Sequence, residues 1–296
     1  MPVKKNNFGK KVLVTGTSTG IGRCVVHALM ESGFTVLAGV RTSADRKALL
    51  QMQTDCRRLH PLLLDVTDDE QVQAAVAVAD QLGGKDGLFA VVNNAGISVP
   101  GPVEYAPLEE FRRAFEVNLV GQLRVIQAFL PLIRRGKGRI VQVSSALGRL
   151  AMPLSGPYAS SKYALEGLTD SLRRELRPWG IRVSLIEPGS VRSAIWEKID
   201  AQARGIQRAL PEEMQKIYAP LAEPMTHIWK EAELRAVPPA IAARAVLHAL
   251  HARHPRTRYL VGPDAYAVAA LSTLVPARAM DWLLKMFLRK VRSSKC

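Results

Sequence analysis

The sequence has 296 residues, of which 48% are hydrophobic and 23% are charged. This composition is that of a packed globular protein, and it argues against a disordered, collagen-like or coiled-coil chain. The 41 Lys and Arg residues outnumber the 26 Asp and Glu residues, which gives a formal net charge of +15. No helix-turn-helix, zinc-finger or RNA-binding strand motif accompanies this charge, so we expect no nucleic-acid partner.

Cysteine is rare in the chain. Cys24, Cys56 and Cys296 form neither a C-x-x-C pair nor a Cys/His zinc spacing, which predicts no disulfide framework and no metal site. Residues 1–11 are polar and basic, and the first apolar run, Val12–Val14, is too short for a signal peptide or a membrane span. We therefore expect a cytoplasmic protein that is not secreted.

Short apolar runs alternate with segments of helical periodicity from Lys11 to Val261. The predicted strands are Val12–Thr15, Val36–Val40, Leu62–Leu64, Phe89–Val92, Ile140–Val143, Val183–Ile186 and Tyr259–Val261. The predicted helices are Ile21–Glu31, Asp69–Leu82, Leu108–Ile133, Ala159–Arg177 and Pro239–Ala252. Because the strand runs are continuously apolar, both faces of the sheet must be covered. The pattern predicts an α/β fold, a doubly wound parallel sheet of about seven strands with helices on both faces, in a single domain spanning residues 9–296.

Two segments interrupt this rhythm. Residues 194–237 contain three prolines and several aromatic residues after the sixth strand, where open α/β sheets bind ligands, and we interpret them as a substrate lid. The extension 263–296 ends in an amphipathic basic segment, 277–296. That pattern suggests peripheral contact with an anionic membrane as one possibility. We favour the alternative that the helix closes the substrate lobe or packs at a subunit interface.

A glycine-rich turn joins the first strand to the first helix. Gly16, Gly20 and Gly22 stand at the spacing G-x-x-x-G-x-G. Glycine permits a tight turn and a close approach of backbone N–H groups to a phosphate, and the helix dipole favours the negative charge. The strand–turn–helix context predicts a dinucleotide site.

Further motifs follow later strands. Asp65 follows the third, Asn93-Asn94-Ala95-Gly96 the fourth, Ser145 the fifth, and Tyr158-x-x-x-Lys162 opens the next helix. With these motifs, residues 9–262 resemble the short-chain dehydrogenase/reductase family. The resemblance implies a Rossmann-type fold that binds a nicotinamide dinucleotide, with hydride transfer between an alcohol and its carbonyl compound.

Tyr158 and Lys162 are four residues apart on one helix, so their side chains share a face. An ammonium beside a phenol lowers the pKa of the phenol, which would let Tyr158 act as general acid and base. The resemblance implies that Lys162 also holds the nicotinamide ribose, that Asn118 supports a water chain to Lys162, and that Ser145 binds the substrate oxygen. Ser144 is the alternative to Ser145, and simple capping of the strand end is the alternative to a catalytic role.

The resemblance also implies a set of cofactor contacts. Asp65 and Val66 would hold the adenine, although Asp65 could instead be a helix cap. The remaining contacts are Gly16, Ser18, Thr19, Gly20, Ile21 and Gly22 at the turn; Asn93, Ala95 and Gly96; Tyr158 and Lys162; and Pro188, Gly189, Val191 and Ser193 near the nicotinamide.

The end of the second strand reads Gly39-Val40-Arg41-Thr42. It has no carboxylate for ribose hydroxyls, and the Arg41 guanidinium suits a 2′-phosphate, with Ser18 and Thr42 as hydroxyl partners. The strand end therefore favours NADP(H) over NAD(H) as the cofactor. NAD(H) stays open, because Thr19 stands where many NADPH-dependent members place Lys or Arg.

The predicted substrate pocket is mainly apolar and is lined by Ser145, Leu147, Met152, Ser155 and Trp196. It favours a hydrophobic alcohol, ketone or aldehyde that is steroid- or retinoid-like. The pattern resembles the branch of 17β-hydroxysteroid and retinol dehydrogenases, and the family implies a homodimer or homotetramer. A non-catalytic redox sensor or scaffold on the same fold is the alternative function.

Overall fold

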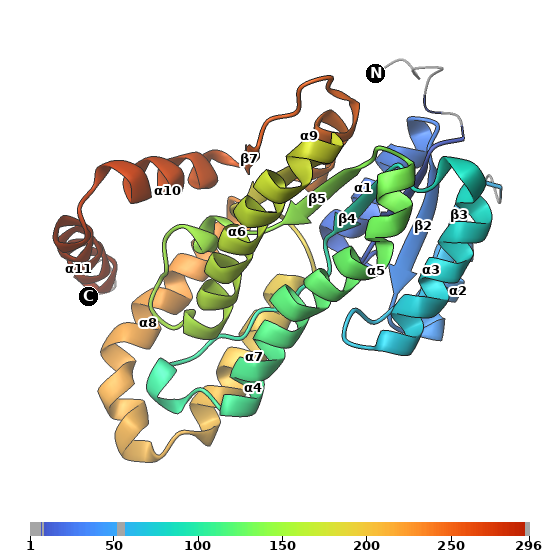
Figure 1. Ribbon diagram of the computed structural model, residues 1–296. Coiled ribbons are helices and arrows are strands. Elements are labelled where there is room, and N and C mark those ends of the chain that lie inside the picture. The colour runs from blue at the N-terminus through green and yellow to red at the C-terminus, as the bar shows by residue number, and fades with distance from the viewer. Residues whose placement is uncertain (1–6, 8, 52–56, 294–296) are drawn as a thin grey trace.

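A computed structural model describes residues 7, 9–51 and 57–293. Seven parallel strands form one sheet in the order β3-β2-β1-β4-β5-β6-β7 (Figure 1). The predicted α/β fold is therefore confirmed. The strands are β1 (Lys11–Val14), β2 (Thr35–Val40), β3 (Leu59–Leu63), β4 (Ala90–Asn93), β5 (Arg139–Val143), β6 (Arg182–Pro188) and β7 (Arg258–Val261).

Helices cover both faces of this sheet. One face packs against α1 and α9, and the other packs against α3, α5 and α6. The α-helices are α1 (Gly20–Glu31), α2 (Ser43–Gln51), α3 (Asp69–Gly83), α4 (Leu108–Phe115), α5 (Gly121–Arg135), α6 (Gly156–Leu176), α7 (Ile195–Ala209), α8 (Glu212–Leu234), α9 (Pro239–His251), α10 (Pro263–Leu274) and α11 (Ala277–Ser293).

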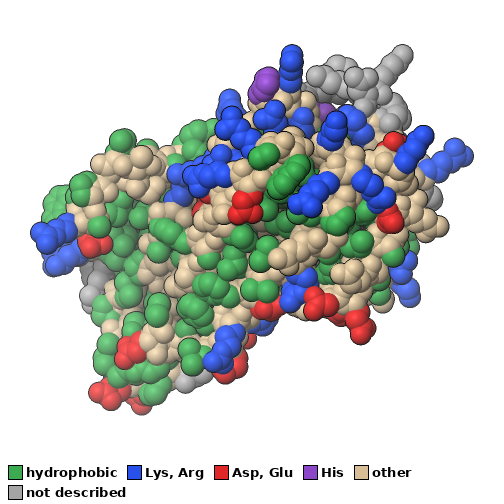
Figure 2. All heavy atoms as spheres, viewed as in Figure 1, with side chains coloured by type: hydrophobic (Ala, Val, Ile, Leu, Met, Phe, Trp, Pro, Cys, Tyr) green, Lys and Arg blue, Asp and Glu red, His purple; other side chains and the backbone are tan. Residues whose placement is uncertain are grey.

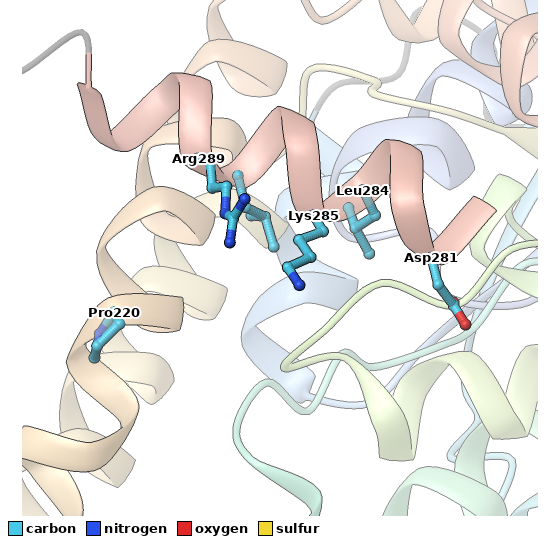
Figure 3. Close-up of a pocket in the computed structure, with 6 residues that line it drawn as sticks. Pro220, Asp281, Leu284, Lys285 and Arg289 are labelled. Carbon is cyan, nitrogen blue, oxygen red and sulfur yellow. The ribbon is translucent and has the colours of Figure 1, made fainter. Parts of the chain in front are cut away.

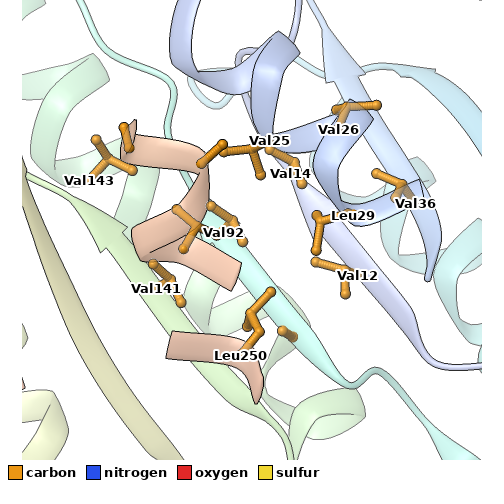
Figure 4. Close-up of a cluster of buried hydrophobic side chains, with 14 of the residues drawn as sticks. Val12, Val14, Val25, Val26, Leu29, Val36, Val92, Val141, Val143 and Leu250 are labelled. Atoms are coloured by element: carbon orange, nitrogen blue, oxygen red, sulfur yellow. The ribbon is translucent and has the colours of Figure 1, made fainter. Parts of the chain in front are cut away.

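Each face of the sheet has its own hydrophobic core. Successive side chains of a strand point to opposite faces, so Val12 and Val14 of β1 enter the core beneath α1 and α9, whereas Leu13 enters the core beneath α3 and α5. Figure 4 shows the first of these cores, in which Val25 and Leu29 of α1 approach the sheet valines. This double burial explains why the strands lack alternating polarity.

The strand order reverses between β1 and β4. The chain runs outward from β1 to β2 and β3, and then from β4 through β5 and β6 to β7. The carboxyl ends of β1 and β4 therefore diverge into connections on opposite sides, which opens a crevice at this edge of the sheet. Residues 15–22 and 93–96 lie at this point.

The predicted helix Leu108–Ile133 is interrupted. A π-helical turn at Glu116–Val120 separates α4 from α5, and it contains the buried Asn118. A π turn carries one more residue than an α turn and is common at functional sites. The apolar periodicity continues through it, so the sequence contained no signal for the break.

Helices not foreseen also appear. Helix α2 has a single buried residue, Leu49, so its apolar pattern is weak. Segment 194–237 consists mostly of α7 and α8, and α8 continues through Pro220 and Pro224. In the part of the chain that the structure describes, no helix is both long and apolar enough to cross a membrane.

Phe129 of α5 tests the assignment of the second core. Its side chain is 0% exposed, so Phe129→Ala should lower the free energy of unfolding by about 3–5 kcal/mol. Urea unfolding followed by tryptophan fluorescence measures this change. The control, Phe287→Ala, alters a half-exposed ring and should cost less than about 1 kcal/mol. Equal losses in the two variants would contradict the assignment.

Candidate active site

The glycine turn is tied to the end of β4 by hydrogen bonds. The Asn94 and Ala95 backbone N–H groups each donate to Thr15 Oγ1 at 3.0 Å. Asn94 Nδ2 donates to the carbonyl oxygens of Thr15 and Gly16, at 3.0 and 2.8 Å. These roles of Thr15 and Asn94 were not predicted, although Asn94 stands inside the N-N-A-G motif.

Two glycines of the turn have no room for a side chain. Gly16 has a φ of +67°, and a Cβ there would lie 2.8 Å from Ala95 Cα. A Cβ on Gly22 would lie 2.5 Å from Asn94 Nδ2. Helix α1 begins with no acidic residue in its first turn, and the Thr19 side chain makes no capping hydrogen bond. These features fit a pyrophosphate against bare backbone and the helix N-terminus.

The same turn is anchored to β2 by Thr17, whose hydroxyl donates to the Gly39 carbonyl at 3.0 Å. On its other side, the turn meets the loop after β6, because a Cβ on Gly20 would lie 2.9 Å from Ser193 Cβ. Ser18 and Ile21 are half-buried in the turn, and Thr19 is exposed. The structure therefore brings the predicted pyrophosphate and nicotinamide ends of the site together.

The loop after β2 presents Arg41 to solvent. Thr42 caps α2: its hydroxyl donates to Asp45 Oδ2 at 2.7 Å and accepts from the Asp45 backbone N–H at 3.1 Å. Thr42 therefore already has a local partner, whereas Arg41 stands at the strand end predicted to select the cofactor.

Asp65 follows β3 without capping the next helix. Its Oδ1 accepts from the backbone N–H and the hydroxyl of Thr67, at 3.0 and 2.8 Å. The N-cap of α3 is Asp68, which accepts from the Gln71 backbone N–H. The alternative interpretation of Asp65 as the helix cap was therefore wrong. Val66 is buried, and its carbonyl accepts from Arg124 Nη1 at 2.8 Å.

Asn118 and Lys162 converge on Gly96. A Cβ on Gly96 would lie 3.2 Å from Asn118 Oδ1 and 3.6 Å from Lys162 Nζ. Asn118 Nδ2 donates to the Ile97 carbonyl, and Oδ1 accepts from the Ile97 N–H at 2.8 Å. Asn93 is buried behind this loop, where its Nδ2 donates to the Gln122 carbonyl at 3.0 Å.

The predicted hydroxyl and ammonium groups meet at the carboxyl end of β5. Ser145 is buried, and its hydroxyl makes a hydrogen bond with the half-buried Tyr158 at the start of α6. One turn later, Lys162 Nζ donates to the Val143 carbonyl at 2.9 Å and lies 5.8 Å from the centroid of the Tyr158 ring. Such a group can bind a carbonyl oxygen and exchange a proton with it.

The pKa of Tyr158 differs from the expectation. Burial raises the pKa of Tyr158, and the hydrogen bond from Ser145 lowers it only in part. The prediction that the Lys162 ammonium brings this pKa down was wrong for the chain alone, since Lys162 Nζ donates to the backbone of β5 instead. Burial also lowers the pKa of Lys162 to about 8, against the opposing effect of Glu166.

A buried group of charges lies behind Lys162. Glu166, one turn further along α6, accepts from Arg258 Nη2 at 2.9 Å. Arg258 also contacts Glu187, which is 0% exposed at the end of β6, at 3.1 Å, and Arg149 pairs with the same carboxylate. Burial and then Glu187 raise the pKa of Glu166, while Arg258 lowers it. This group was not predicted, because its members come from α6, the end of β6, the start of β7 and the connection after β5.

The loop after β6 completes the crevice. A side chain on Gly189 would collide with the Asp264 carboxylate of α10, and the Ser190 N–H donates to Asp264 Oδ2 at 2.5 Å. Pro188 is buried at the strand end, and Val191 pairs with Val237, the last residue of the lid. The sequence contained no signal for Asp264.

The predicted substrate residues lie in two places. Leu147, Met152 and Ser155 belong to the connection between β5 and α6, where the Ser155 hydroxyl donates to the Met152 carbonyl at 2.5 Å. Trp196 lies at the start of α7, and its Nε1 donates to the Val191 carbonyl at 3.0 Å. The lid also reaches across: a Cβ on Gly101 would lie 3.3 Å from two methyl carbons of Ile206 in α7.

Comparison with known proteins agrees with this geometry. The family model described as short chain dehydrogenase matches residues 10–204. Retinol dehydrogenase 5 of Mus musculus is 36% identical over 292 residues, covering 96% of this chain and 90% of the relative. The NADPH-dependent 3-dehydrocapnine reductase of Ornithobacterium rhinotracheale is 33% identical, covering 94% and 97%.

A solved structure supports the same assignment. The short chain dehydrogenase of Burkholderia cenocepacia J2315, crystallised in complex with NADP, superposes with a TM-score of 0.71 and 27% identity, covering 94% of this chain and 98% of the other. The chain belongs to the short-chain dehydrogenase/reductase family, near its retinol and hydroxysteroid dehydrogenases, and is an NAD(P)-dependent enzyme acting on CH–OH groups.

Proposed function

We propose that the chain is an NADP(H)-preferring oxidoreductase that interconverts a hydrophobic alcohol with its ketone or aldehyde, of steroid- or retinoid-like character. One observation carries the proposal: the hydrogen-bonded hydroxyls of Ser145 and Tyr158 lie beside the buried Lys162 at the edge of the glycine crevice. A redox sensor would have no evident need of this arrangement.

In this mechanism Ser145 binds the substrate oxygen and Tyr158 exchanges its proton with it. In reduction, the Tyr158 hydroxyl donates the proton to the carbonyl oxygen; in oxidation, the phenolate accepts the alcohol proton. The Lys162 ammonium would hold the hydroxyls of the nicotinamide ribose, and Asn118 fixes the loop of Gly96 and Ile97 beside it. When bound, the nicotinamide supplies or accepts the hydride.

The same crevice would hold the cofactor. Gly16, Ser18, Thr19, Gly20, Ile21 and Gly22 would receive the pyrophosphate, Asp65 and Val66 the adenine, and Asn93, Ala95 and Gly96 the adjoining ribose. Pro188, Gly189, Val191 and Ser193 would face the nicotinamide. Bare backbone at Gly16 and Gly22, where a Cβ would collide, supports this placement.

The remaining features concern the substrate and assembly. Leu147, Met152, Ser155 and Trp196 would line an apolar pocket beneath α7 and α8, and the relative named as a retinol dehydrogenase supports a lipophilic substrate.

The three cysteines favour a reducing compartment, the cytoplasm. Exposed Leu108, Val120 and Tyr163 on the helices α4 to α6 support a homodimer or homotetramer.

The role of Tyr158 is tested by Tyr158→Phe, which removes the proton donor with little change in volume. Turnover of a hydrophobic ketone with NADPH should fall by about 10²- to 10⁴-fold, while NADPH still quenches tryptophan fluorescence. The control Tyr163→Phe changes a partly exposed hydroxyl on the same helix and should keep full turnover. Undiminished turnover in Tyr158→Phe would rule out the assigned role and favour a sensor.

Cofactor choice is tested by Arg41→Ala. Loss of a charge-assisted contact with the 2′-phosphate should weaken NADPH binding about tenfold to a hundredfold and leave NADH binding unchanged. Fluorescence titration with each cofactor measures both affinities. Lys47→Ala removes a nearby exposed charge and controls for the general attraction between positive charge and the anionic cofactor. If Arg41→Ala weakens neither cofactor, Arg41 is an ordinary surface residue.

The buried charges behind Lys162 predict a pH effect. The Glu166 carboxylate raises the pKa of Lys162 against burial, so Glu166→Gln should lower that pKa further below about 8. Because the mechanism uses the protonated ammonium, the alkaline fall in kcat/KM should begin at lower pH. Measurement from pH 6 to 10, with exposed Glu175→Gln on the same helix as control, tests this. An unmoved alkaline limb in Glu166→Gln would show that Glu166 does not act through Lys162.

A further inference from the structure

Helix α11 exposes a row of large apolar side chains. Trp282, Leu283, Met286 and Phe287 are between 41% and 60% exposed. The helix packs on α8, and its residues Met280, Leu284, Leu288 and Val291 are only partly exposed. The helix is therefore apolar on two sides. Packing on α8 accounts for the apolar side that faces α8, but not for the exposed row.

Basic side chains border this exposed row. Arg278, Lys285 and Arg289 follow at seven- and four-residue spacing, so they share one stripe of the helix. Figure 3 shows Lys285 and Arg289 reaching into a cleft whose opposite side is Pro220 of α8; Asp281 also lines it. At the left end of Figure 2, basic and hydrophobic side chains adjoin over this helix. The surface combines apolar area with positive charge.

The charge distinguishes between the partners that could cover this surface. Residues 277–296 contain six Lys and Arg residues and one Asp. A second copy placed on the same row by two-fold symmetry would bring two such positive segments together. Four side chains are also a small area beside the ~800 Å² that each partner buries in a stable protein interface. An anionic lipid membrane matches both features, because its headgroups carry negative charge and its acyl chains can cover the apolar row.

We propose that α11 is a peripheral docking helix for anionic lipid membranes. Trp282, Leu283, Met286 and Phe287 enter the boundary between headgroups and acyl chains, while the stripe of Arg278, Lys285 and Arg289 contacts lipid phosphates. Leu274 at the end of α10, 78% exposed, lies three residues before the helix and extends the apolar contact. The inference is independent of the proposed substrate, since it concerns binding alone.

The full-length protein should be tested by flotation with vesicles of phosphatidylcholine alone and with 30% phosphatidylserine, in 0.15 M salt. We expect binding to the anionic vesicles and little to the neutral ones, with loss at 0.5 M salt. Leu283→Ser/Phe287→Ser and Arg278→Gln/Lys285→Gln should each weaken binding about tenfold or more. Turnover of a water-soluble carbonyl substrate should stay unchanged in both variants, which shows that they are folded.

Two matched variants serve as controls. Leu50→Ser/Leu234→Ser removes exposed apolar area elsewhere, and Lys47→Gln/Lys85→Gln removes the same charge from other exposed sites; both should bind like the unmodified protein. Three results would overturn the proposal: no binding to anionic vesicles, equal weakening by the controls, or dissociation of an oligomer by Leu283→Ser/Phe287→Ser in the absence of lipid. The last result would assign the row to a second copy.

Discussion

The site depends on the hydrogen bonds that join the ends of β1 and β4. Asn94 donates to the carbonyls of Thr15 and Gly16, while Thr15 accepts from the backbone after Asn93. These bonds hold two diverging connections at the point where the strand order reverses. The glycine turn gains its shape from them, because Gly16 and Gly22 are pressed against the residues that they fix. One residue past this clamp, Gly96 brings the same loop to Asn118 and Lys162.

Charge balance is the second constraint on the site. Lys162 is buried, and an ammonium removed from water is costly unless a carboxylate or a backbone carbonyl compensates it. The chain supplies both, through Val143 and Glu166. Glu166 then needs compensation of its own, which Arg258 provides while also holding Glu187. A single buried cation in α6 is thus linked to the ends of β6 and β7, so the core behind the site is polar by necessity.

Most of the fold follows from the sequence because apolar runs and helical periodicity reflect burial directly. The seven strands and the crevice at Gly16 to Gly22 were predictable for that reason, and Tyr158 and Lys162 could be paired by helical spacing alone. The π turn around Asn118 was not, since it leaves the apolar pattern intact. Asp264 and Arg258 act across long sequence separations, which local patterns do not encode. The pKa of Tyr158 could not be predicted without the position of Lys162 Nζ. Sequence spacing shows that the two side chains share a helix face, but it does not give the distance between them.

The hydrogen bond from the Ser190 N–H to Asp264 ties the first helix of the C-terminal extension, α10, to the crevice. Helix α10 begins at the loop that would face the nicotinamide, and it also packs against the turn at 146–148. Helix α11 begins only after Pro276 and has its main contact on α8. The inner half of the extension is therefore part of the crevice, whereas its outer half contacts mainly α8. Replacing α10 would disturb the loop after β6, but a change in α11 would leave that loop untouched.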